Sequence, residues 1–192
     1  MLKLVDLIEQ SGVALGDFKI HCAIDNKRNG WRPLQAYFEG KFDLDQSQQS
    51  QENFDCDHIV SLINISNSRR WLYVGTYRVN GVRAATGWNG FVYKMKRLPG
   101  LDHLDGRATV DFPKTFRASY LVGRRFRDSL VVSSIREEKH SIADFPGFNS
   151  VRLSFETLRS IVRQDNPSWR SALANVAGVY VIMARTGDKG PK

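Results

Sequence analysis

The chain has 192 residues and a formal net charge of +8, from 28 Lys and Arg against 20 Asp and Glu. This length allows one complete domain and part of a second, because domains commonly span about 100–200 residues. Hydrophobic residues make up 42% of the chain, and no apolar run approaches the roughly 20 residues that cross a bilayer. We therefore expect a soluble protein without a membrane partner.

Cys22 and Cys56 are the two cysteines; they form no CxxC motif, and the chain has no signal-like start. This usage predicts free thiols and a cytoplasmic location. The four histidines are scattered without zinc spacing. Because neither a Gly-Lys-Ser/Thr phosphate loop nor GxGxxG is present, ATP-driven and nicotinamide chemistry have no support.

Positive charge is concentrated in the second part of the chain. Residues 1–60 hold six Lys or Arg and ten Asp or Glu, whereas residues 69–127 hold thirteen Lys or Arg and three acidic residues. A basic surface attracts polyanions, because neutralised phosphates release condensed counterions. We therefore expect nucleic acid, duplex DNA above all, as the partner; a merely solvated basic surface is the alternative.

The first part of the chain predicts two short helices and a loop. Leu4, Leu7 and Ile8 share one face of a helix near the start, and apolar residues after Pro33 suggest a second helix. The polar, glutamine-rich stretch 42–53 is interpreted as a mobile loop.

Strand patterns begin at His58. Runs rich in β-branched and aromatic residues predict five strands, at 58–65, 69–79, 90–96, 107–112 and 129–137, the first two as an antiparallel pair. Trp71, Tyr73 and Tyr77 share one strand face by period two and are expected in the core. The pattern predicts an α+β fold: a curved antiparallel β-sheet or small β-barrel with short capping helices.

Basic residues at strand ends and turns are the predicted nucleic-acid contacts. They are Arg69, Arg70, Lys94, Lys96, Arg97, Arg124, Arg125 and Arg127. Arg grips phosphate with two hydrogen bonds and Lys acts as a mobile point charge, so these contacts would be independent of base sequence. Trp88, in the loop ATGWNG, is the candidate for stacking on a base, with a core-packed tryptophan as the alternative.

At the end of the chain the pattern predicts a Trp-containing amphipathic helix followed by an apolar strand. There, Gly178-Val179-Tyr180 resembles the first half of the signature of the GIY-YIG nuclease superfamily, with Val179 in place of the isoleucine. The second half, a Tyr-Ile-Gly or Tyr-Val-Gly strand, would lie beyond Lys192. The resemblance therefore implies a β-rich nucleic-acid-recognition domain at 1–165 and the start of a truncated GIY-YIG α/β domain at 166–192; an unrelated buried strand is the alternative.

The resemblance implies phosphodiester hydrolysis by a restriction-type endonuclease. The family uses tyrosines, an arginine and a glutamate-bound divalent metal, which offset charge on the phosphate. Only Tyr180 carries over as a catalytic residue. Mg²⁺ or another divalent metal is thus expected in the full-length protein, and the 192-residue fragment, without cofactor, is expected to be inactive.

Two other hypotheses stay open. One is a stand-alone nucleic-acid-binding barrel that reads RNA or modified DNA. The other is a self-contained metal nuclease, because Asp111, Glu137 and Lys139 resemble the Asp…Glu-x-Lys site of another nuclease superfamily. Tyr73-Val74-Gly75 reproduces the second half of the GIY-YIG signature, but neither Gly nor Tyr occurs in the preceding HIVSLI, so it is interpreted as an ordinary strand.

Overall fold

The computed structural model describes residues 1–24, 32–65, 68–113 and 119–145. The chain divides into two units, Met1–Ser150 and Val151–Lys192, and all described residues belong to the first. The domain boundary expected at residues 165 and 166 lies outside the described residues, as does Gly178-Val179-Tyr180.

The described elements are short apart from one long strand. The helices are α1 (Leu4–Gln10), α2 (Pro33–Phe38), α3 (Phe42–Ser47) and α4 (Gly123–Phe126), with 3-10 turns η1 (Arg127–Ser129) and η2 (Ile142–Asp144). The strands are β1 (Phe18–Ala23), β2 (Gln48–Gln49), β3 (His58–Asn64), β4 (Arg70–Ala84), β5 (Phe91–Arg97), β6 (Ala108–Asp111), β7 (Tyr120–Val122) and β8 (Val131–Ile135). Within the described ranges, none of the helices has the length and apolar character needed to span a membrane.

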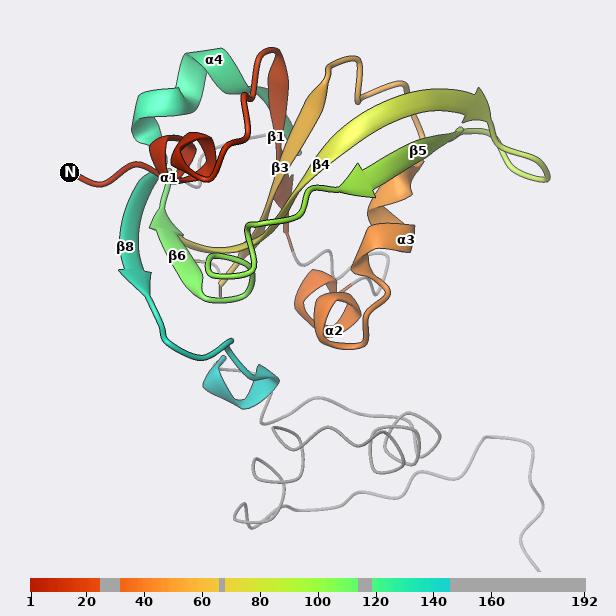
Figure 1. Ribbon diagram of the computed structural model, residues 1–192. Coiled ribbons are helices and arrows are strands. Elements are labelled where there is room, and N and C mark those ends of the chain that lie inside the picture. The colour runs from red at the N-terminus through yellow and green to blue at the C-terminus, as the bar shows by residue number, and fades with distance from the viewer. Residues whose placement is uncertain (25–31, 66–67, 114–118, 146–192) are drawn as a thin grey trace, which may run out of the picture. The chain divides into compact units, whose positions relative to one another are not determined.

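All the strands join one sheet that curls into a half-barrel (Figure 1). The strand order is β2-β5-β4-β3-β1-β7, with β6 paired to β4 and β8 paired to β6. The β1–β3 pair is parallel, and the other strand pairs are antiparallel. The expected α+β fold, a curved and mainly antiparallel sheet with short helices, is confirmed, as are the five expected strands.

Strand β4 organises this sheet because it pairs with three other strands. Along one edge it pairs with β3, and along the other it pairs first with β6 and then with β5. Bulges interrupt both long ladders, next to Gly75 and Gly81, whose φ angles are +138° and +149°. Glycine adopts this backbone region with little strain, so the two residues let one strand bend from one partner to the next.

The bulge at Gly75 also divides the predicted core residues between two faces. Trp71, Tyr73 and Tyr77 are each at most 1% exposed, which confirms that they belong to the core. However, Trp71 and Tyr73 pack in one apolar cluster and Tyr77 in another. The shared face expected from period two is therefore wrong, because the extra residue at the bulge reverses the alternation.

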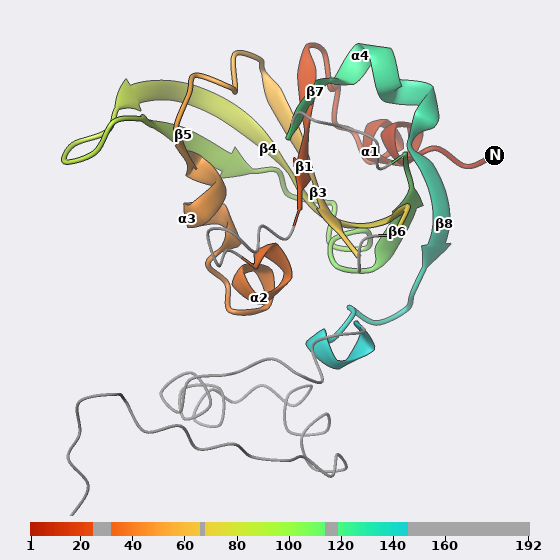
Figure 2. The ribbon, with the colours of Figure 1, turned by 180° about the vertical axis from the view of Figure 1, so that it is seen from behind.

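The helices lie in two groups. Viewed from behind in Figure 2, α2 and α3 lie together on the side of β5, while α1 and α4 lie near β8. Helix α3 and strand β2 occupy residues 42–49 of the stretch 42–53, so the interpretation of this stretch as a mobile loop is wrong. The order comes from burial of Phe42 and Gln46, each 1% exposed, against partners distant in sequence.

We predict that Gly75→Ala lowers the free energy of unfolding by about 2–4 kcal/mol. An added Cβ would be strained at φ +138° and would lie 2.9 Å from the Arg97 Nη1 atom. Gly81→Ala is the matched control, because φ is +149° but nothing lies within 4 Å of the added Cβ. It should lose only about 1–2 kcal/mol. Urea unfolding measures both, and equal losses would contradict the importance of the Arg97 contact.

Candidate nucleic-acid interface

The outer parts of β4 and β5 form a two-stranded ribbon that projects from the domain (Figure 1). Residues paired across antiparallel strands share a face. The register pairs Arg78 with Lys96, Gly81 with Lys94, and Arg83 with Val92. Arg78, Arg83, Lys94 and Lys96 therefore lie on one face, which we call the basic face. All four side chains are exposed, and within the described residues none of them forms an ion pair.

Sequence reasoning found only half of the basic face. Lys94 and Lys96 were predicted, two residues apart on β5, but Arg78 and Arg83 were not. These arginines are five positions apart, with four residues between them, so unbroken alternation would put them on opposite faces. The register skips Asn80, and this bulge brings both arginines to the same face. The missing signal was the position of the bulge.

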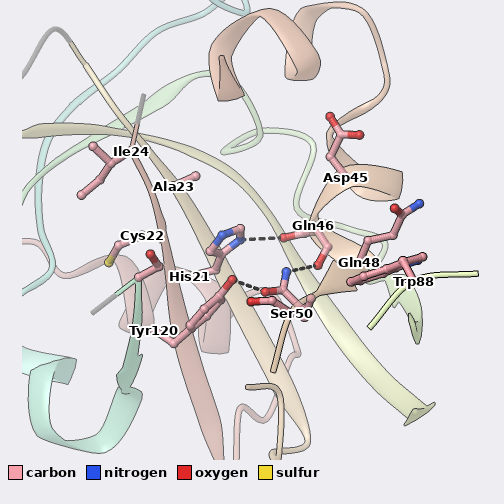
Figure 3. A pocket seen from close by; sticks show the side chains of 12 residues that line it. His21, Cys22, Ala23, Ile24, Asp45, Gln46, Gln48, Ser50, Trp88 and Tyr120 are labelled. Atoms are coloured by element: carbon pink, nitrogen blue, oxygen red, sulfur yellow. Dashed lines mark hydrogen bonds between the residues drawn. The ribbon is translucent and has the colours of Figure 1, made fainter. Parts of the chain in front are cut away.

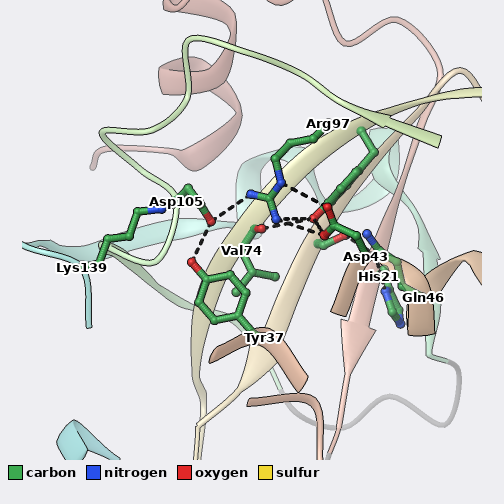
Figure 4. A network of polar contacts seen from close by, with 10 residues as sticks. His21, Tyr37, Asp43, Gln46, Val74, Arg97, Asp105 and Lys139 are labelled. Atoms are coloured by element: carbon green, nitrogen blue, oxygen red, sulfur yellow. Dashed lines mark hydrogen bonds and ion pairs between the residues drawn. The ribbon is translucent and has the colours of Figure 1, made fainter. Parts of the chain in front are cut away.

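Arg97 does not join the basic face, although it was predicted to contact nucleic acid. Its Nη2 atom lies 3.1 Å from Asp43 Oδ1 and donates to the Tyr77 hydroxyl at 2.6 Å, and its Nη1 atom lies 3.1 Å from Asp105 Oδ1 (Figure 4). The guanidinium also lies over the Tyr77 ring, 5.0 Å from its centroid. Arg97 thus holds α3, β4 and the loop before β6 together.

Asp105 extends this network beyond Arg97. It accepts a hydrogen bond from the Tyr37 hydroxyl at 2.9 Å and pairs with the Lys139 ammonium at 2.7 Å. Asp105 is 7% exposed, and these partners compensate the cost of burying its charge. Burial raises the pKa of Tyr37, and the Asp105 carboxylate raises it further, so this hydroxyl keeps its proton and donates.

The other predicted basic residues lie on separate surfaces. Arg69 precedes β4 and Arg70 begins it, opposite Asp111 of β6, and both arginines are exposed. Arg124 and Arg125 are exposed on α4, on the far side of the domain from the ribbon tip in both ribbon views. Arg127 pairs with Glu9 of α1. The structure therefore does not bring the predicted set together.

A pocket of about 530 Å³ opens where the curled sheet almost closes on itself (Figure 3). The two ends of the strand order, β2 and β7, meet there, and the Tyr120 hydroxyl donates to Gln49 Oε1. His21 of β1, Gln46 of α3 and Trp88 of the β4–β5 loop also line this pocket. Four segments far apart in sequence, at 21–24, 45–50, 88 and 119–120, therefore contribute to one cavity.

Gln46 and His21 give the pocket its polar character. Gln46 is 1% exposed, and its Oε1 atom accepts from Ser61 Oγ at 2.8 Å and lies 3.1 Å from His21 Nδ1. An amide oxygen only accepts, so Nδ1 carries the proton and Nε2 of His21 is an acceptor. Burial lowers the pKa of His21 to about 4, which makes the ring neutral at pH 7. Nε2 of Gln46 is buried and has no partner among the described residues.

Aromatic rings supply the apolar walls. The rings of His21 and Tyr120 stack, with centroids 5.1 Å apart and planes 18° apart. Trp88 is 42% exposed and lines the pocket from the loop, so it does not pack in the core. A Cβ at Gly90 would lie 1.8 Å from Cζ3 of Trp88, which means that the indole rests on the glycine backbone. The glycines beside Trp88 thus place its ring at the pocket.

The residues of the alternative metal nuclease lie apart. Asp111 pairs with Val131 at one end of the β6–β8 ladder, whereas Glu137 lies beside Arg107 at the other end. Four residues of a strand span about 13 Å, too far for both carboxylates to hold one ion. Lys139 is paired with Asp105 instead. Across the described ranges, no three His, Cys, Asp or Glu side chains are grouped to hold a metal.

Both cysteines are free, as expected. Burial raises the pKa of Cys22 to about 12 and that of Cys56 to about 11. Both thiols therefore stay protonated at neutral pH, which leaves them without nucleophilic character.

We predict that His21 makes the fold less stable in acid. Unfolded His21 binds a proton near pH 6.5 and folded His21 only near pH 4, so the unfolded state binds more protons between these values. The contribution of His21 to the free energy of unfolding is fully present above about pH 6.5 and is lost as the pH is lowered toward 4. Between pH 7 and pH 4.5, His21→Phe should lose about 2–3 kcal/mol less stability than the wild type. Chemical unfolding of both proteins at both pH values tests this. If the variant and the wild type lose the same free energy of unfolding between pH 7 and pH 4.5, the prediction is wrong.

Comparison of the chain with protein-family models, curated proteins and solved structures found no match. The resemblance at Gly178-Val179-Tyr180 therefore stays a prediction, and these residues lie outside the described part of the chain. The described residues form a projecting basic face and, next to the ribbon loop, an aromatic pocket whose described lining has no Lys or Arg.

Proposed function

We propose that residues 1–145 form a DNA-binding domain whose basic face contacts the backbone of a duplex. The observation that carries this proposal is the alignment of Arg78, Arg83, Lys94 and Lys96 on one exposed face. Basic side chains release counterions from phosphates when they bind, which favours association at moderate salt. A two-stranded ribbon also fits the width of the major groove of B-DNA.

The dimensions of the basic face support a contact with several phosphates. Arg78 and Arg83 are five residues apart on β4, which corresponds to roughly 15 Å along the strand. Duplex DNA carries about one negative charge per 1.7 Å of its axis, so the ribbon can meet phosphates at both ends. Apolar side chains, among them Val79, Tyr93 and Met95, cover the opposite face and pack against the domain. The ribbon therefore has one face for the core and one for the nucleic acid.

We further propose that the full-length protein is a GIY-YIG-type endonuclease in which this domain holds the DNA that the nuclease domain cuts. The support is the resemblance at Gly178-Val179-Tyr180, with Tyr180 as its catalytic residue and a divalent metal as its cofactor. A stand-alone binding module is the second candidate. It is favoured by the fact that the basic face and the pocket are both formed by residues 1–145.

We predict that Lys94→Gln with Lys96→Gln weakens duplex binding about tenfold or more at 0.1 M salt. The slope of log K against log salt should become shallower by about 2, because fewer counterions are released. Fluorescence anisotropy with a labelled duplex at several salt concentrations measures both quantities.

The matched control is Arg124→Gln with Arg125→Gln, which removes the same charge from α4. Both arginines are exposed there and lie away from the ribbon. The proposal expects a smaller change in affinity and slope for this control. If the α4 variant loses affinity and the ribbon variant does not, the DNA lies on α4 and the assignment of the basic face is wrong.

We predict that the full-length protein cleaves DNA in Mg²⁺ and that EDTA stops it, whereas the 192-residue chain binds without cleavage. Tyr180→Phe in the full-length protein should lower the cleavage rate by at least about a hundredfold with little change in affinity, because a catalytic tyrosine acts on the reacting groups. Gel analysis of the probes gives the rates. Metal-dependent cleavage by the 192-residue chain would contradict this assignment.

A further inference from the structure

We infer that the pocket between β2 and β7 receives a single nucleobase, turned out of the base stack of the nucleic acid that the basic face holds. The inference rests on the proposed function and adds to it the part of the ligand that is recognised. Three observations support it: the position of the pocket, the groups inside it, and the charges that surround it.

The mouth of the pocket lies at the edge of the ribbon, while its inner wall lies on the opposite face of the sheet, where Tyr120 packs with Tyr93 and Met95. Gln48 of β2 pairs with Val92 of β5, and Val92 also pairs with Arg83 of β4. These three side chains therefore share one face. Gln48 lines the pocket, and so does Trp88, in the loop that joins the two ribbon strands. A nucleotide whose phosphate lies at the Arg83 end of the basic face therefore reaches the pocket by turning its base around this edge, past Gln48 and Trp88.

The groups inside the pocket match a planar heterocycle with hydrogen-bonding edges. Gln46 offers the unpaired Nε2 donor, and the neutral His21 ring has Nε2 as an acceptor. The rings of Tyr120 and Trp88 line the same cavity and provide faces for stacking. A buried amide without a partner is rare in folded proteins and calls for a ligand or a bound water. The volume of about 530 Å³ lies within the usual range for small-ligand pockets, about 300–1,000 Å³.

The charges of the residues that line the pocket do not attract a phosphate into it. Asp45 is the charged residue among the described lining residues, and no Lys or Arg is among them. A phosphate would therefore find no cation among the described lining residues, whereas it would meet four on the basic face. Backbone and base are therefore directed to different sites: phosphates to the ribbon, and one neutral base to the pocket.

Three duplexes of one sequence test this inference by fluorescence anisotropy: fully paired, with a single central mismatch, and with abasic sites at both mismatched positions. A mismatched base leaves the stack more easily. The wild-type chain should therefore bind the mismatched duplex about tenfold more tightly than the other two. Trp88→Ala should lose this preference, so that the mismatched duplex binds no more tightly than the other two. Trp88→Phe, which retains a ring, should keep most of the preference.

The possible results distinguish recognition of a base by the pocket from binding of the backbone by the basic face. Lys94→Gln with Lys96→Gln should weaken binding of all three duplexes by the same factor and leave their ratio unchanged. If the wild type binds the paired and mismatched duplexes equally, the inference is overturned and the proposed function stands. If the abasic duplex binds as tightly as the mismatched one, the protein recognises flexibility instead of a base, and the inference is again overturned. If no duplex binds, the proposed function fails as well.

Discussion

The arrangement of the domain depends on the contacts that the guanidinium of Arg97 makes. This guanidinium is reached by carboxylates from two segments, Asp43 of α3 and Asp105 of the loop before β6, and by the hydroxyl of Tyr77. Gly75 leaves the space that this group occupies. Since partly buried charges are stable only when they are paired, this cluster specifies where α3 docks. Three residues after Asp43, the same helix carries Gln46 into the pocket.

The bulges of β4 link this internal network to the outer surface. The first, beside Gly75, turns Tyr77 toward Arg97 instead of leaving it on the face of Trp71 and Tyr73. The second, at Asn80, returns Arg83 to the face of Arg78. A bulge reverses the alternation of every residue that follows it. Two one-residue insertions therefore decide which side chains of a single strand are core, network or binding surface.

The proposed recognition separates two kinds of chemistry. Exposed cations on the ribbon attract phosphate, and this attraction depends on salt. The pocket, whose described lining has no Lys or Arg, offers a donor, an acceptor and aromatic faces. The low pKa of His21 belongs to this arrangement, because a charged imidazole at this buried position would replace the acceptor by a donor. The curled sheet allows both sites to coexist, since its strand order brings β2 back to β7 at the pocket while β5 continues into the ribbon.

Local patterns in the sequence by themselves determined five of the eight described strands, without β1, β2 and β7. They also determined the first two helices, the burial of Trp71 and Tyr73, and the basic character of Lys94 and Lys96. These features depend on neighbouring residues, so periodicity and composition are sufficient to find them. Only the tertiary structure decided the role of Arg97, the burial of Gln46 within a stretch that looks like a loop, and the alignment of Arg78 with Arg83. Each of these depends on a strand register or on a partner distant along the chain, and local composition carries no information about either.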